Sequence, residues 1–132
     1  HCHPKQAESP LHITANRIQF TDIGGKAEGQ VHLNTSSHVG EAQRVDWQRS
    51  TPNQLSIQLH EKAHLICPEG EVFGDRLNYD PHAALLRAQA GNGNQARLLL
   101  KDGREILSPW IQFDMNRRLL STGKAVVSRK QP

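Results

Sequence analysis

A short pattern recurs along this chain and limits its possible folds more than any other feature. "EVFGDRLNYD" starts at Glu71 and "EILSPWIQFD" at Glu105, and both end in apolar, amide, aromatic and Asp residues. A third copy, "HITANRIQFT", starts at His12, and a weaker fourth, "EAQRVDWQ", starts at Glu41. Repetition of a short unit indicates an architecture that stacks one supersecondary element. We therefore expect a repeated strand pair with loops of variable length.

Alignment of the four copies produces three chemically uniform columns. The order apolar, polar, aromatic has a period of two, which places the aliphatic and aromatic side chains on one face of a strand and the polar side chain on the other. The columns therefore predict half-buried strands. The aliphatic column holds Ile18, Val45, Leu77 and Ile111, the polar column Gln19, Asp46, Asn78 and Gln112, and the aromatic column Phe20, Trp47, Tyr79 and Phe113.

An odd spacing within three copies predicts corners in the strands. An apolar residue stands five positions before the aliphatic column, as Ile13 does before Ile18. Simple alternation would place such a pair on opposite faces, so a bulge or bend must turn the strand between them. Gly74 and Pro109 stand at such places, and both residue types occur at bulges and edges of sheets. We expect corners at residues 15–16, 74–75 and 108–109 that let two facing sheets curl into a flattened tube.

The rest of the chain favours short strands over helices. Turn-forming residues interrupt the apolar segments every 8 to 12 residues, which is typical of an antiparallel all-β domain. "GNGN" at 91–94 predicts a hairpin turn, and Asp80 and Asp114 predict turn caps. "DPHAALLRAQAG" is nearest to a helix, but its equivalent in the last copy is rich in turn formers, so we expect a strand there. The further expected strands cover residues 30–33, 55–59, 63–67, 84–88, 96–100 and 124–128.

Composition bounds the class of protein. Only 36% of the 132 residues are hydrophobic, so the core must be thin or spread over many short elements. No apolar stretch approaches the roughly 18 residues of a membrane helix. The first residue is His1, so we expect a processed or excised segment of a longer protein. Cys2 and Cys67 permit one disulfide, and the sequence leaves open whether it forms.

Charged residues offer candidate contacts for an anionic partner. The mild net charge of +3 suits an anionic partner or a solvated surface. Arg17, Arg44 and Arg76 share the column before the aliphatic residues and point outward, so they are candidate contacts for phosphate groups, with an ordinary wet sheet face as the alternative. We expect no nucleic-acid partner.

The sequence gives little support for a metal site or for catalysis. His60, His64 and Cys67 allow a zinc site, but surface histidines explain them better because a fourth ligand is not evident. We expect no metal and no cofactor. Since the chain has no nucleophile elbow, no convincing acid pair and no phosphate loop, we expect no enzyme.

Two phrases resemble a known family. "VFGDRLNYDPHAALLRA", followed by a glycine, and "ILSPWIQFDMNRRLLSTGKAVV" resemble the OstA-like β-jellyroll repeat of lipopolysaccharide-transport proteins. The resemblance covers residues 11–128, clearest over 71–128 and weakest over 34–60. It implies a jellyroll domain at 11–128, between an N-terminal extension at 1–10 and a C-terminal tail at 129–132.

What the resemblance implies is a twisted β-jellyroll, a flattened or V-shaped two-sheet sandwich of about four strand-pair repeats. It implies the periplasm of a Gram-negative cell envelope, with a membrane anchor as an option for the full-length protein. The implied function is lipid binding or lipid transport, with lipopolysaccharide or a similar glycolipid as partner and end-to-end joining through edge strands. The implied lipid slot is lined by Ile18, Phe20, Val45, Trp47, Leu77, Tyr79, Ile111 and Phe113.

Two alternatives stay open. The same eight residues can form a filled core without a ligand, because alternating apolar residues line any β-sandwich. The chain can also be a structural or protein-interaction domain that assembles through its edge strands.

Overall fold

The structure of the chain is a computed structural model that describes residues 12–34, 38–51, 54–68 and 70–129. The expected N-terminal extension at 1–10 lies outside these residues. Strands are the only regular elements among them, and none of them forms a helix long and apolar enough to cross a membrane. The strands are β1 (His12–Thr14), β2 (Arg17–Phe20), β3 (Gly24–Asn34), β4 (Val39–Thr51), β5 (Gln54–Cys67), β6 (Gly70–Asp80), β7 (Leu85–Gln89), β8 (Ala96–Leu100), β9 (Arg104–Ser108), β10 (Trp110–Asp114), β11 (Leu119–Thr122) and β12 (Val126–Arg129).

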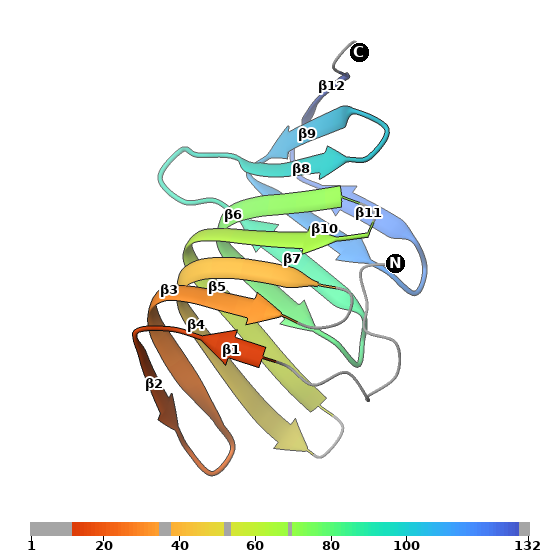
Figure 1. The fold of residues 1–132 in the computed structure, drawn as a ribbon. Coiled ribbons are helices and arrows are strands. Elements are labelled where there is room, and N and C mark those ends of the chain that lie inside the picture. Colours follow the sequence, from red (N-terminus) through yellow and green to blue (C-terminus); the bar gives the residue numbers. More distant parts are fainter. Residues whose placement is uncertain (1–11, 35–37, 52–53, 69, 130–132) are drawn as a thin grey trace.

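The long strands β3 to β6 run through two layers and bend between them. They curve round on the same side of the molecule (Figure 1). Where they bend, the register between neighbouring strands shifts, or, in β6, the partner changes from β8 to β7. These irregularities lie side by side and form a crease. The shifts fall between Glu28 and Val31 in β3, Glu41 and Arg44 in β4, and His60 and Ala63 in β5.

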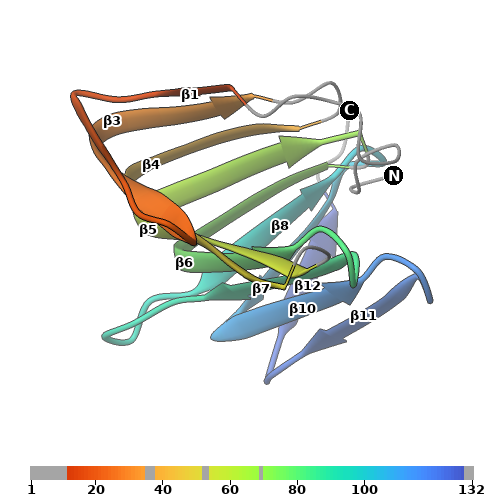
Figure 2. The ribbon, with the colours of Figure 1, turned by 90° about the horizontal axis from the view of Figure 1, so that it is seen from below.

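The crease divides the strands into two sheets, which we name after their edge strands. The β1–β12 sheet contains β1, β8, β9, β12 and one half of each long strand. The β2–β11 sheet contains β2, β7, β10, β11 and the other halves. All pairings are antiparallel, and the two sheets spread from the crease like the arms of a V (Figure 2). The expected antiparallel V-shaped jellyroll is confirmed.

The three expected corners are confirmed. β1 ends at Thr14 and β2 begins at Arg17, so the chain turns at 15–16. β6 changes partner at Gly74, and Pro109 separates β9 from β10. A corner that we did not expect joins 55–59 and 63–67 into one strand, β5.

The corner of β5 has unusual backbone conformations. Glu61 and Lys62 have φ angles of 64° and 56°, in the left-handed region that residues other than glycine rarely adopt. Leu59 before the corner and Leu65 after it are both buried and have the same parity, so these two residues bend the strand without changing its alternation. The corner of β3 is built in the same way from Gly29 and Gln30, with φ angles of 81° and 48°.

The prediction of a hairpin turn at "GNGN" is wrong. Residues 91–94 connect β7 to β8, which lie in different sheets and pair with different parts of β6. Asn92 and Gly93 do adopt the left-handed conformation of a tight turn. Local turn chemistry is the same whether the next strand pairs with the previous one or crosses the crease, so the sequence pattern could not separate the two.

The expected turn caps and the strand after Asp80 are confirmed. Asp80 Oδ1 accepts hydrogen bonds from the backbone N–H groups of His82 and Ala83 at 3.0 and 3.1 Å. Asp114 Oδ1 accepts one from the N–H of Arg117 at 3.1 Å. After the first of these turns the chain continues as β7, so the helical alternative does not form.

Candidate functional site

The inner face of the β2–β11 sheet carries two apolar rows that run across the strands. Side chains at paired register positions project from the same face of a sheet, so a row can be followed from strand to strand. The aliphatic row consists of Ile18, Ala27, Val45, Leu59, Leu77, Ala88, Ile111 and Thr122. The ring row consists of Phe20, Gly25, Trp47, Ile57, Tyr79, Leu86, Phe113 and Leu120.

These rows contain all eight residues proposed for the lipid slot. The repeat copies lie on β2, β4, β6 and β10, which are alternate strands of this sheet, so their columns fall into register with one another. Val45, Leu77, Tyr79 and Ile111 are buried, and Ile18, Trp47 and Phe113 are half-buried. Phe20 is 78% exposed because β2 is an edge strand with no neighbour beyond it among the described residues.

The β1–β12 sheet presents a third apolar row to the other two. We call this the facing row: Ile13, Leu33, Gly40, Leu65, Val72, Leu98, Ile106 and Val127. Its central members and those of the other rows belong to one core cluster. The three rows together form what we call the apolar seam, which extends from the β1 and β2 edge to the β11 and β12 edge.

Sequence reasoning missed the intervening strands of the seam. β3, β5, β7 and β11 contribute the other members of the aliphatic and ring rows, and Ala27, Leu59 and Leu86 among them are buried as completely as the predicted residues. The alternation in "LSIQL" was a signal for β5, but Ala27 and Gly25 carry no apolar pattern. Gly25 lies under the indole of Trp47, which a Cβ at this position would overlap. The absence of a side chain there makes room for the ring.

A ring contact joins the two sheets at the end of the seam away from the crease. His38, which precedes β4 in the β1–β12 sheet, lies 5.4 Å from the ring of Tyr79 in the other sheet, with an interplanar angle of 41°. Both residues are buried, and burial raises the pKa of the Tyr79 hydroxyl. The seam is therefore closed in this state by contact between side chains of opposite sheets.

The three arginines proposed as anion contacts lie on the outer face of the β2–β11 sheet. They form an outer row in which acidic or imidazole side chains alternate with them: Arg17, Glu28, Arg44, His60 and Arg76. All three are exposed, as their parity predicted. They point away from the seam, so a phosphate bound by them would lie across the sheet from an acyl chain.

Asp46 ties part of this outer row together. Its Oδ2 lies 3.1 Å from His60 Nε2 and 3.7 Å from Arg44 Nε. Burial lowers the pKa of His60 below its usual 6.5, the cation of Arg44 lowers it further, and Asp46 opposes both effects. His60 is therefore largely neutral near pH 7.

The residues of the zinc alternative do not converge. Cys67 is disulfide-bonded and faces the seam, so its sulfur is not a thiolate ligand. The other cysteine of the chain, Cys2, lies outside the described residues. His60 and His64 lie on opposite sides of the β5 corner and belong to different sheets. His64 instead stacks on Phe73, with ring centroids 4.1 Å apart, and its Nε2 lies 3.1 Å from Glu71.

Exposed apolar side chains collect at both edges of the two sheets. Phe20 and Ile23 lie at the β2 edge, and Leu119, Val126 and Val127 lie on β11 and β12 at the opposite edge. Edge strands of soluble proteins usually carry charges that discourage pairing with other chains. The apolar edges of this chain therefore favour contact with a further strand.

Comparison with solved structures supports the fold. The chain is similar to the crystal structure of LptH, the LptA homologous periplasmic component of the conserved lipopolysaccharide transport device from Pseudomonas aeruginosa. The TM-score is 0.84 over 98% of this chain and 100% of that one, with 15% sequence identity. The two chains share one fold. No protein-family model and no curated protein matches the sequence.

Proposed function

We propose that this chain holds the acyl chains of a lipopolysaccharide or similar glycolipid in its apolar seam, as a non-enzymatic lipid-transport module in the periplasm. The observation that carries the proposal is the continuity of the seam. Its three rows extend without a charged residue from one open edge of the jellyroll to the other. The shared fold with LptH supports the same conclusion.

Entry of a lipid requires the sheets to separate. In the closed state Leu59, Leu77 and Leu98 are buried against the rest of the core. Burial of apolar surface contributes about 0.8 kcal/mol per CH₂ group, so an acyl chain of about twelve carbons gains about 10 kcal/mol on leaving water. That gain is large enough to replace contacts between the sheets by contacts with the lipid. The His38–Tyr79 contact is the place where we expect the sheets to part.

The edges of the jellyroll suit end-to-end assembly. If β11 of one copy meets β2 of the next, and β12 meets β1, each row of the seam continues into the neighbouring copy. Leu120 would then extend to Phe20, and Val127 to Ile13. Stacking of this kind buries the apolar side chains that the single chain exposes, and it lengthens the seam without a new site.

The lipid proposal is tested by photo-crosslinking on the two faces of β10. A benzophenone amino acid replaces Phe113, which faces the seam, or its neighbour Gln112, which faces outward. Irradiation with lipopolysaccharide should label the protein substituted at 113 and leave the one substituted at 112 unlabelled. Equal labelling at both positions, or labelling at 112 alone, would contradict binding in the seam.

The protein-interaction alternative rests on the apolar edges and needs a separate readout. Sedimentation velocity of the lipid-free chain should show concentration-dependent oligomers that Phe20→Asp and Val127→Asp abolish. Oligomers together with seam-specific crosslinks support both parts of the proposal. Oligomers without crosslinks at 113 would favour a purely structural role for the domain.

A further inference from the structure

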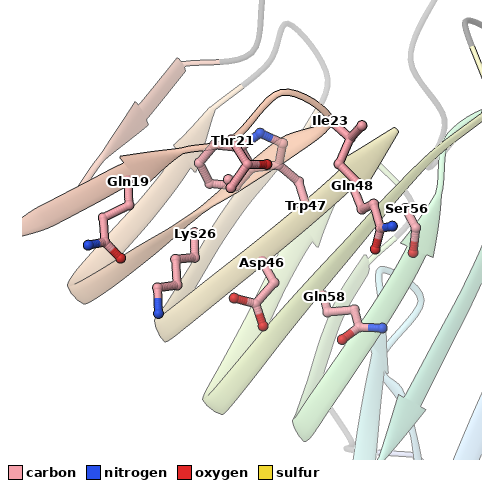
Figure 3. Close-up of a pocket in the computed structure, with 10 residues that line it drawn as sticks. Gln19, Thr21, Ile23, Lys26, Asp46, Trp47, Gln48, Ser56 and Gln58 are labelled. Carbon is pink, nitrogen blue, oxygen red and sulfur yellow. The ribbon is translucent and has the colours of Figure 1, made fainter. Parts of the chain in front are cut away.

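A second hollow lies on the outside of the molecule, on the face of the β2–β11 sheet opposite to the seam. It is a groove of about 440 Å³ over β2, β3, β4 and β5. Gln19, Lys26, Asp46 and Gln58 occupy successive register positions on these strands and project side by side from them (Figure 3). Its remaining lining residues are Thr21, Ile23, Gly25, Trp47, Gln48 and Ser56.

The lining chemistry selects for a neutral ligand. Lys26 and Asp46 carry opposite charges that cancel. Lys26 Nζ also lies 3.7 Å from Glu28, and Asp46 lies 3.1 Å from His60, so each charge has a partner within the protein. A phosphate site would need convergent cations, and a metal site would need convergent acids. Neither arrangement is present among the residues that line this groove.

Five of the uncharged lining residues carry amides or hydroxyls. Gln19, Gln48 and Gln58 each offer donors and an acceptor, and Thr21 and Ser56 offer hydroxyls that do both. Such groups match a ligand whose own hydroxyls donate and accept at many positions. The apolar part of the lining consists of Ile23, Gly25 and Trp47, so the groove combines hydrogen-bonding groups with apolar surface.

The outer face of the other sheet has a different composition, with ion pairs such as Arg97 with Glu105 and an exposed apolar pair. There Val39 and Ile66 are register partners and are 39% and 38% exposed. On the β2–β11 sheet the polar row continues beyond the groove through Asn78, Arg87, Gln112 and Ser121. Arg87 is held there by a 3.0 Å hydrogen bond to Gln112 and by the ring of Trp110 at 4.7 Å.

We propose that this groove binds a neutral oligosaccharide that lies across β2 to β5. Its volume falls within the roughly 300–1,000 Å³ of small-molecule sites. The four strands of the groove present hydrogen-bonding groups at the strand spacing of about 4.8 Å. Most of the lining projects from the face opposite to the seam, and Gly25 and Trp47 of the ring row border the groove at the β2 edge. The proposal does not depend on the lipid-transport proposal.

The test is an NMR titration of the full chain with a soluble tetramer of β-1,4-linked N-acetylglucosamine. The expected result is saturable shifts of backbone amides confined to β2, β3, β4 and β5. Gln58→Ala should weaken binding about 2- to 10-fold, the effect of losing one neutral hydrogen bond. Gln112→Ala is the matched control, because it removes the same amide from the same polar row outside the groove and should leave the affinity unchanged.

A salt titration and a fatty-acid competition test which kind of ligand the groove binds. Raising the salt concentration to 0.5 M should leave the affinity unchanged, whereas a steep loss would mean that charge carries the binding and would overturn the proposal. An excess of a fatty acid should not displace the sugar, which separates this site from the seam. No shifts at millimolar sugar, shifts spread over both sheets, or equal effects of Gln58→Ala and Gln112→Ala would each overturn it.

Discussion

Tyr79 and Phe20 occupy the same column of the repeat and the same row of the seam, yet their environments differ sharply. Tyr79 is 8% exposed and contacts the opposite sheet through His38, whereas Phe20 is 78% exposed on an edge strand. Replacing each by alanine removes an aromatic ring from chemically equivalent sequence positions. The difference between the two losses of stability therefore reports the burial of Tyr79 together with its contact with the opposite sheet.

The magnitudes follow from the buried area. A buried aromatic side chain removes about 150–250 Å² from water, which at about 25 cal/mol per Å² corresponds to about 4–6 kcal/mol as an upper bound. Truncation of buried aromatic residues to alanine costs about 3–5 kcal/mol, so we expect Tyr79→Ala to lose about that much. Since Phe20 keeps about a quarter of this burial, mainly against Trp47 at a 6.0 Å centroid distance, Phe20→Ala should lose about 1 kcal/mol.

Urea unfolding at low protein concentration measures both losses. Dilution keeps the chain monomeric, so that contacts of Phe20 with another copy do not contribute. An unchanged m value would show that the surface exposed on unfolding is the same in each variant. Losses that agree within about 1 kcal/mol, or a larger loss for Phe20→Ala, would refute the arrangement of the ring row.

Three other perturbations have definite expected outcomes. Because burial and Arg44 lower the pKa of folded His60, the unfolded chain takes up the proton first as the pH falls below 6.5, so the free energy of unfolding should fall there. His60→Gln should reduce that loss, and identical pH profiles from pH 8 to 5 would contradict it. Cys67→Ser should lower the free energy of unfolding by about 2–4 kcal/mol, because the disulfide is lost. Reductant should lower the melting temperature of the wild type and leave that of Cys67→Ser unchanged. In Gly70→Ala the new Cβ would overlap the backbone carbonyl of Leu99 in the neighbouring strand, at a cost of about 1–3 kcal/mol in urea unfolding. Gly91→Ala, where the nearest atom lies 3.8 Å away, is its control, and equal losses would count against the β6–β8 pairing.

The repeat made much of the fold predictable from sequence. Because copies on β2, β4, β6 and β10 share one template, the facing of their side chains and the position of three corners followed from parity alone. The spacing of Val72 and Leu77 required a corner without any knowledge of the partner strands. Local rules were also sufficient for the turn caps, since Asp80 and Asp114 accept hydrogen bonds from residues close to them in sequence.

Features that depend on distant partners were not predictable. The loop at 91–94 crosses the crease instead of closing a hairpin, and nothing local distinguishes the two. The corner at Glu61 and Lys62 contains neither glycine nor proline, so no residue type marked it. The exposure of Phe20 arises from its place in the last strand of a sheet, which the strand's own sequence does not encode.

The exposed apolar edges favour the proposed module that continues into another chain over a plain β-sandwich. A sandwich that only needed a filled core would gain nothing from apolar side chains beyond its last paired strand. Natural sheets commonly protect such positions with charge, proline or short strands, because an exposed apolar edge promotes association. Here the exposed ends of the rows include Phe20 at one edge and Val127 at the other, each on the seam side of its strand. Exposed apolar edges lower solubility, which is understandable if the seam has to be continuous across copies. Under that proposal a charged residue at either end would block both stacking and the passage of an acyl chain.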